Sequence, residues 1–103
     1  TKVLFGGNEI ELYEDGSAHL TSTKGLAGST LKVNMGLKVL VEKAMVPWDY
    51  AINSCTLNPA RLLGIDSRKG AIRAGNDADI VVLNDDYSVE TTYARGKVVY
   101  EKQ

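Results

Sequence analysis

The sequence predicts an α+β fold in which strands at both ends of the chain flank two helices. Apolar and polar residues alternate with a period of two near the start and near the end, as they do in half-buried strands. Between these regions, apolar residues recur at the three- and four-residue spacing of a helix face. With 103 residues, 44% of them hydrophobic, the chain has the size and composition of one small domain.

The first predicted element is a β-hairpin over residues 3–20 with two glycine-containing turns. Gly6-Gly7 ends its first strand, and an alternating run from Glu9 to Tyr13 follows. Glu14-Asp15-Gly16 has the composition of a second turn, after which residues 18–20 form a short return strand.

A run of small residues, Gly25-Leu26-Ala27-Gly28-Ser29, leads into the first helix. We expect a loop here, whose backbone N–H groups, just before a helix N-terminus, can approach a polar or anionic ligand closely. It is not a P-loop, because no Lys-Ser/Thr pair follows at the required spacing. From the residues alone, a tight connection that merely lets the helix pack is an equally good interpretation.

The first helix is predicted to have its N-cap at Ser29 or Thr30 and to run to about Lys43. Its buried face is predicted from helical spacing, and it comprises Val33, Leu37, Leu40, Val41 and Ala44.

The second helix is predicted to begin at Pro47, whose missing N–H costs nothing in a first turn. It directs Ala51, Ile52, Cys55 and Leu57 toward a core. We expect Asn58-Pro59 to interrupt it, because a proline disfavours the α conformation in the residue before it. A helical turn over 60–63 then ends at Gly64, a typical C′ residue.

After Gly64 the pattern changes to strands. Residues 70–86 predict a short strand, a glycine-rich turn and a continuous apolar strand, Ile80–Leu83. Residues 88–102 predict two alternating strands around a hairpin turn at Arg95-Gly96.

Composition excludes several classes of partner. The formal net charge is −1, and no basic stripe or polybasic tail is present, so we expect no nucleic-acid partner. No apolar run approaches the roughly 18 residues that span a bilayer, so no membrane partner is expected. A single cysteine fits a reducing compartment such as the cytoplasm. Because Thr1 is not an initiator methionine, we expect the chain to be a piece of a longer protein.

The reactive side chains of the sequence do not make a complete active site. His19 is the only histidine and Cys55 the only cysteine, and a metal site with nitrogen and sulfur ligands normally needs three or four such groups. His19 is therefore interpreted as a strand or surface residue and Cys55 as core filler. The carboxylate pairs Asp77/Asp79 and Asp85/Asp86 flank a strand, where turn residues commonly hydrogen-bond nearby backbone. We assign no catalytic residue and no metal ligand.

The second half of the chain resembles a known superfamily. The stretch "NPARLLGIDSRKGAIRAGNDADIVVLNDD", from Asn58 to Asp86, followed by "VETTYARGKVVY", resembles the C-terminal tail of metal-dependent amidohydrolases. In that superfamily the last barrel helix runs into Asn-Pro-Ala, a glycine-rich turn and the strands of a small β-sandwich. This tail carries little information about the substrate.

The first half narrows the resemblance. "LFGGNEIELYEDGSAHL" and then "GLAGSTL" are similar to the N-acetylglucosamine-6-phosphate deacetylase family, in which such a hairpin precedes a loop that touches the amino sugar. The resemblance implies that Leu26, Ala27 and Gly28 contact substrate. Lys24-Gly25 departs from the family pattern before this loop. Phe5 replaces the usual leucine, and His19 stands where arginine is common.

The resemblance also implies the architecture and chemistry of a larger enzyme. Residues 1–64 would belong to the C-terminal end of a (β/α)8 barrel, and residues 65–103 to the C-terminal strands of a β-sandwich. A divalent metal, zinc or iron, would be bound outside this chain, and the proton-transferring aspartate would also lie outside it. The full enzyme would release acetate from N-acetylglucosamine 6-phosphate in amino-sugar catabolism, as a homo-oligomer, and this piece alone would be inactive.

Two alternatives remain open. The chain could be the tail of another amidohydrolase that acts on a different N-acyl or cyclic amide substrate, or it could be a freestanding non-catalytic α+β module. The module predicts that the apolar face of helix 31–43 is covered within the chain. A piece of a barrel predicts an uncovered stripe formed by Val33, Leu37, Leu40 and Val41.

Overall fold

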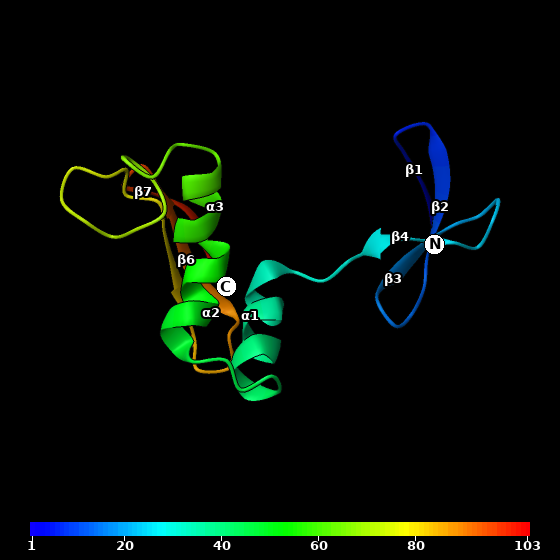
Figure 1. Cartoon of the computed structure of the whole chain (residues 1–103), viewed down its shortest axis with the longest axis horizontal. Coiled ribbons are helices and arrows are strands. Elements are labelled where there is room, and N and C mark those ends of the chain that lie inside the picture. The colour runs from blue at the N-terminus through cyan, green and yellow to red at the C-terminus, as the bar shows by residue number, and fades with distance from the viewer. The chain divides into compact units, whose positions relative to one another are not determined.

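The computed structural model describes all 103 residues, which form two antiparallel sheets and three helices (Figure 1). The chain divides into two compact units, residues 1–32 and residues 33–103. The first unit contains β1 Lys2–Phe5, β2 Asn8–Leu12, β3 Ser17–Leu20 and β4 Leu26–Ser29. The second unit contains α1 Val33–Glu42, α2 Trp48–Cys55, α3 Leu57–Leu62, β5 Ile80–Leu83, β6 Val89–Ala94 and β7 Lys97–Glu101.

The first unit is a four-stranded sheet with the strand order β1-β2-β3-β4. The predicted hairpin over residues 3–20 is confirmed, and Gly6 and Gly7 have the positive φ angles (59° and 81°) that a two-residue hairpin turn of type I′ needs. Ile10 and Ala18 are the buried residues of this unit, each 8% exposed. The sheet therefore has a very small core of its own.

The loop expected at residues 25–29 is instead a strand. Leu26–Ser29 forms β4, which pairs antiparallel with β3, and Lys24 (φ 61°) makes the turn that returns the chain. Small residues carry little strand propensity, so the pairing with β3 decides the conformation rather than the local sequence. The helix also begins later than predicted, at Val33. Ser29 Oγ accepts a hydrogen bond from the Leu31 N–H ahead of the helix, so it does not act as the helix N-cap.

The helices of the second unit correct one further prediction. The interruption lies at Thr56 (φ −127°), one residue before α3, and Pro59 is within the first turn of that helix. A proline is tolerated there because the first N–H groups of a helix have no intrahelical partner. Gly64 has a φ of 72°, which confirms it as the residue that ends this helical segment.

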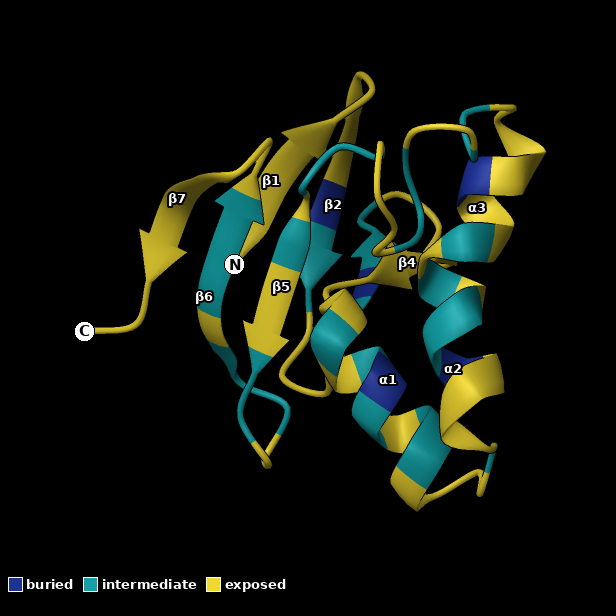
Figure 2. Cartoon of the chain, turned by 90° about the vertical axis from the view of Figure 1, so that its left-hand side faces the viewer, coloured by how far each residue is buried: buried dark blue, intermediate teal, exposed yellow.

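The apolar stripe on α1, which a piece of a barrel was predicted to leave exposed, is mostly buried within this chain. Leu37 is only 4% exposed, and Leu40 and Val41 are half-buried, while Val33 remains 69% exposed. Helix α1 packs against α2, and Asn34 Nδ2 donates a hydrogen bond to the Tyr87 carbonyl at 2.9 Å. Figure 2 shows how few positions in the chain are fully buried.

The C-terminal sheet has the order β5-β6-β7. Its predicted strands are confirmed, and Arg95 (φ 51°) and Gly96 (φ 83°) form the predicted hairpin turn. The short strand expected within residues 70–79 is absent. This segment is a loop held by polar contacts, including Asn76 Nδ2 to the Ala71 carbonyl and the Asp77 N–H to the Arg68 carbonyl.

Candidate functional site

The three residues predicted to contact substrate lie on an edge strand. Leu26, Ala27 and Gly28 form β4 together with Ser29, and all of them are exposed. Because β4 has β3 on one side only, part of its backbone N–H and C=O groups face away from the sheet. The segment thus presents backbone donors and acceptors as we expected, although from a strand and not from a loop.

A β-bulge interrupts the strand at Ala27. His19 pairs with Leu26 and Ala18 pairs with Gly28, so Ala27 is the extra residue with no partner across the ladder. Bulges re-aim side chains and leave backbone groups unpaired, and they are common next to binding sites.

Gly28 has no structural reason, within this chain, to be a glycine. Its φ is not positive, and a Cβ built on it would meet nothing within 4 Å. A glycine inside a strand weakens it, and often marks a place where a ligand or another backbone approaches closely. The open space beside Gly28 fits such an approach.

Both ends of β4 are fixed to the rest of the sheet. At one end, the Leu20 N–H donates to the Gly25 carbonyl at 2.9 Å, and at the other the Thr30 N–H and Oγ1 donate to the Gly16 carbonyl at 2.8 and 3.0 Å.

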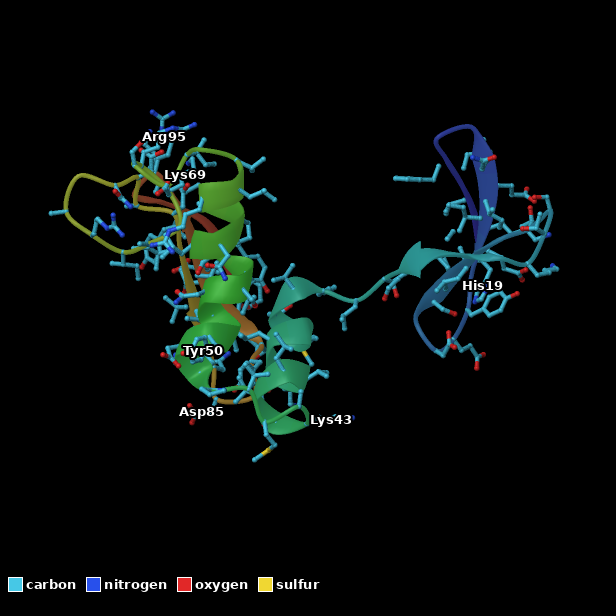
Figure 3. All side chains as sticks on the ribbon, viewed as in Figure 1. His19, Lys43, Tyr50, Lys69, Asp85 and Arg95 are labelled. Atoms are coloured by element: carbon cyan, nitrogen blue, oxygen red, sulfur yellow. The ribbon has the colours of Figure 1, made fainter.

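Beside β4 lies a polar cluster that the sequence interpretation missed. Asp15, Ser17 and His19 are connected by side-chain hydrogen bonds, and the imidazole is stacked on Tyr13 with 4.2 Å between ring centroids. Figure 3 labels His19 among the strands of the first unit. The available signal was the spacing of two between Ser17 and His19, which places both on one face of β3, whereas Asp15 lies in the turn before that strand.

Three of the four carboxylates in these pairs, Asp77, Asp79 and Asp86, stabilise local structure through hydrogen bonds or ion pairs. Asp86 Oδ1 accepts a hydrogen bond from the Ser88 N–H, and Asp79 Oδ1 accepts one from the Arg95 N–H, as predicted for residues beside turns. Lys69 forms ion pairs with both Asp77 and Asp79, and these lower the pKa of each carboxyl, chiefly through its hydrogen bonds to the Lys69 ammonium. Figure 3 shows Lys69 and Arg95 near each other in the second unit.

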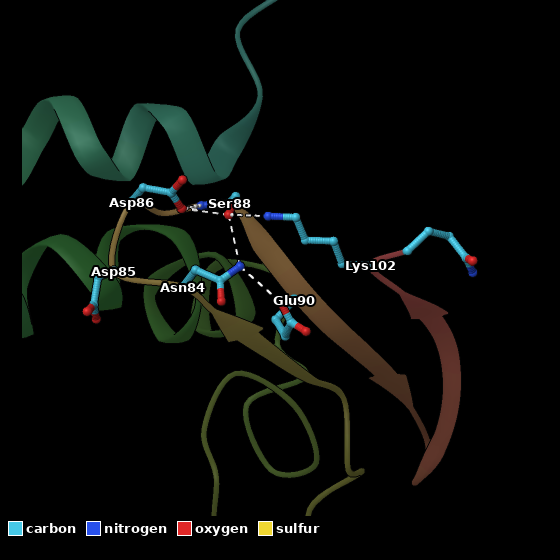
Figure 4. A pocket seen from close by; sticks show the side chains of 7 residues that line it. Asn84, Asp85, Asp86, Ser88, Glu90 and Lys102 are labelled. Atoms are coloured by element: carbon cyan, nitrogen blue, oxygen red, sulfur yellow. Dashed lines mark hydrogen bonds between the residues drawn. The ribbon is translucent and has the colours of Figure 1, made fainter.

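One pocket, of about 640 Å³, lies in the second unit and does not include β4. Its lining residues are Asn84, Asp85, Asp86, Ser88, Glu90, Lys102 and Gln103. Asn84 Nδ2 donates to Ser88 Oγ and to Glu90, and Lys102 Nζ donates to the same hydroxyl (Figure 4). These polar groups satisfy one another, and we assign the pocket no role.

The metal implied by the resemblance has no ligand set among these residues. Nowhere do three His, Cys, Asp or Glu side chains lie close enough together to hold a metal ion. Cys55 is half-buried on α2, where its thiol faces the Ile52 carbonyl at 3.3 Å. None of the helices has the length and apolar character needed to cross a membrane.

Comparison with known families identifies the chain. The model of the amidohydrolase family matches residues 9–99, which include β4 and all of the helices. The chain belongs to the amidohydrolase family. Within this family, the predicted resemblance to N-acetylglucosamine-6-phosphate deacetylases is confirmed by the curated relatives.

Several curated relatives of this chain bear that name, among them a human and a bacterial protein. The Homo sapiens protein is 34% identical over 93% of this chain and 23% of its own length, and the Bacillus subtilis protein is 36% identical over 93% of this chain and 24% of its own. An N-acetylgalactosamine-6-phosphate deacetylase from Escherichia coli O157:H7 is 34% identical over 89% of this chain and 24% of its own. The chain thus spans about a quarter of the length of these relatives.

Solved structures agree with the sequence comparison. The N-acetylglucosamine-6-phosphate deacetylase of Thermotoga maritima matches with a TM-score of 0.84 at 26% identity, over 99% of this chain and 27% of that chain. The Mycobacterium smegmatis enzyme, in complex with N-acetyl-D-glucosamine-6-phosphate, matches with a TM-score of 0.79 at 29% identity, over 95% of this chain and 26% of that chain.

Proposed function

We propose that this chain is the C-terminal part of a hydrolase that removes the acetyl group from N-acetylglucosamine 6-phosphate. The observation that carries the proposal is the 34–36% identity, over 93% of the chain, with curated deacetylases of that name. In such an enzyme, residues 1–64 belong to the end of the (β/α)8 barrel domain and residues 65–103 to the β-sandwich. The protein acts in the cytoplasm, in amino-sugar catabolism, as a homo-oligomer.

The contribution of this chain is to hold the sugar. Leu26, Ala27 and Gly28 offer unpaired backbone groups beside the bulge, and Gly28 leaves space for a ligand to approach. Backbone donors and acceptors of this kind can fix the orientation of a sugar without doing chemistry on it. Orientation contributes to the rate by holding the acetamide in a reactive geometry.

The hydrolytic groups come from elsewhere in the enzyme. A divalent metal, zinc or iron, would supply an activated water when bound, and no group of three His, Cys, Asp or Glu side chains in this chain could hold it by itself. An acidic side chain outside the chain would transfer the proton to the departing amine. The isolated chain is therefore expected to be inactive.

The comparisons support two candidate substrates, which are epimers of each other. The N-acetylgalactosamine-6-phosphate deacetylase of Escherichia coli O157:H7 and the human N-acetylglucosamine-6-phosphate deacetylase are each 34% identical to this chain. N-acetylgalactosamine 6-phosphate is therefore the second candidate substrate.

A chimera tests the proposal. Residues 1–103 would replace the matching part of the Bacillus subtilis deacetylase, and acetate release would be followed with each N-acetylamino-sugar phosphate and with a cyclic amide. We expect turnover of N-acetylglucosamine 6-phosphate by the chimera, and none above a metal blank by the chain alone with added zinc or iron. A chimera that melts cooperatively but hydrolyses only the cyclic amide, or an active isolated chain, would refute the proposal.

A further inference from the structure

We infer that His19 is a positioning residue that holds in place the strand β4, which carries the residues proposed to contact substrate. The inference rests on the proposed function, because it concerns the same segment, Leu26–Gly28. Its structural part can be tested without any substrate.

The first observation is that His19 reaches the turn that precedes β4. The residue pairs with Leu26 across the β3–β4 ladder, and its Nδ1 lies 3.0 Å from the Lys24 carbonyl oxygen. Lys24 has a φ of 61°, a conformation that is uncommon for a residue with a side chain. A hydrogen bond from the imidazole to this carbonyl stabilises the turn and with it the start of β4.

The second observation is that the same ring is connected to the far end of β4. His19 Nε2 lies 3.0 Å from Ser17 Oγ, and Ser17 pairs with Ser29. Asp15 accepts hydrogen bonds from both the side chain and the backbone of Ser17. The cluster Asp15–Ser17–His19 therefore spans the bulged strand from one end to the other.

The contact with the Lys24 carbonyl fixes what the imidazole contributes to the turn. A carbonyl oxygen can only accept, so His19 Nδ1 carries the N–H that donates to Lys24. His19 Nε2 lies 3.0 Å from Ser17 Oγ, which also contacts the Asp15 carboxylate.

Charged and aromatic side chains lie around the imidazole. Glu11 is the partner of His19 across β2–β3, Asp15 lies at the end of the hydrogen-bonded chain, and the Tyr13 ring is stacked on the imidazole. Lys24 is the opposing positive charge, and its ammonium lies 3.7 Å from the Glu11 carboxylate. The hydrogen bonds from Ser17 lower the pKa of Asp15, which keeps that acceptor negatively charged.

The structural test uses amide hydrogen exchange on the 103-residue chain. The Leu20 N–H donates to the Gly25 carbonyl and the Lys24 N–H donates to the Leu20 carbonyl, so both report on the turn. We expect His19→Ala to speed their exchange about three- to tenfold. Thr21→Val is the matched control, because it removes a side-chain hydrogen bond to the Glu9 carbonyl in the same sheet. Equal exchange in wild type and His19→Ala, or rapid exchange of both amides in the wild type, would overturn the inference.

The functional test uses the chimera. His19→Ala is expected to raise KM about three- to tenfold with kcat nearly unchanged, because the segment binds substrate and does no chemistry. His19→Asn, whose amide can still donate to the Lys24 carbonyl, is expected to restore much of the affinity and Thr21→Val to leave KM unchanged.

The split between KM and kcat, together with the His19→Asn rescue, separates this role from a merely structural one. An unchanged KM in His19→Ala, or an equal rise of KM in Thr21→Val, would contradict the inference. A wild-type chimera without sugar-phosphate activity would instead refute the proposed function and leave the hydrogen-exchange result standing.

Discussion

Gly70 and Gly28 differ in whether the structure requires a glycine. At Gly70 the backbone has a φ of 94°, and a Cβ there would lie 2.7 Å from the Ala60 Cβ and 3.1 Å from the Leu57 Cα. The loop after α3 therefore packs directly on that helix at this position. Gly28 has no positive φ and free space around it, so the structure of this chain does not require a glycine there.

Substitution of Gly70 tests the packing argument. We expect Gly70→Ala to lower the free energy of unfolding by about 2–3 kcal/mol, because both the positive φ and the clash with α3 oppose a side chain. Gly75→Ala is the matched control, since Gly75 has a φ of 92° but a Cβ there would meet nothing within 4 Å. Its loss should be about 1 kcal/mol. Equal losses in urea denaturation would mean that the contact with Ala60 contributes nothing.

Among the elements, those encoded by local signals were predictable from the sequence. Gly6-Gly7 and Arg95-Gly96 mark their hairpins, and the apolar run Ile80–Leu83 marks β5. Turn residues and periodicity act within a few positions, so they need no knowledge of the rest of the fold.

The elements that were missed depend on contacts between distant residues. Leu26–Ser29 became a strand because β3 pairs with it, and residues 70–79 remained a loop because Lys69 and its neighbours hold them. Nothing in the small residues of β4 indicates either the strand or its bulge. The substrate-binding role of Leu26–Gly28 came from resemblance and stays a prediction.

The ion pairs of Lys69 should make the second unit sensitive to pH. Lys69 hydrogen-bonds Asp77 and Asp79, which lowers the pKa of both carboxyls and raises that of the ammonium. A lowered carboxyl pKa contributes stability that is present above the unfolded-state pKa of about 4 and is lost as the pH falls through the folded-state value. The raised Lys69 pKa contributes stability that is present below about 10.5 and lost at higher pH.

We therefore expect the urea midpoint of the chain to fall as the pH drops below about 4. Asp79→Asn should make this fall shallower, because one of the two titrating carboxyls is gone. Asp85→Asn, at a residue that makes no salt bridge, should leave the slope as in the wild type. An unchanged slope in Asp79→Asn would show that these exposed pairs add nothing measurable.

Across the whole chain, few hydrophobic residues are buried and many large ones are exposed. The buried hydrophobic residues are Ile10, Ala18, Leu37, Ala51 and Ala60. Leu62 and Leu63, at the end of α3, are 87% and 71% exposed, and Ile72 is 83% exposed. Apolar side chains in such number at a surface normally contact another part of a protein.

Self-association of the isolated chain is the expected consequence. Light scattering should give a mass above 11.1 kDa that declines on dilution, because exposed apolar side chains associate. Leu62→Lys with Leu63→Lys should shift the chain toward monomer. A wild-type chain that stays monomeric at all concentrations would favour the freestanding module over a part of a larger enzyme.

If β4 holds the amino-sugar phosphate, as we propose, a side chain added at Gly28 should block binding, and the KM of a chimera carrying Gly28→Val measures this. A valine suits an edge strand with free space, so the melting temperature should not fall. The added side chain would fill the space beside the sugar, and KM should rise about tenfold or more. Lys97→Val, on the exposed edge strand β7, is the control and should leave KM unchanged. If Gly28→Val binds N-acetylglucosamine 6-phosphate as well as the wild type does, β4 does not contact the substrate.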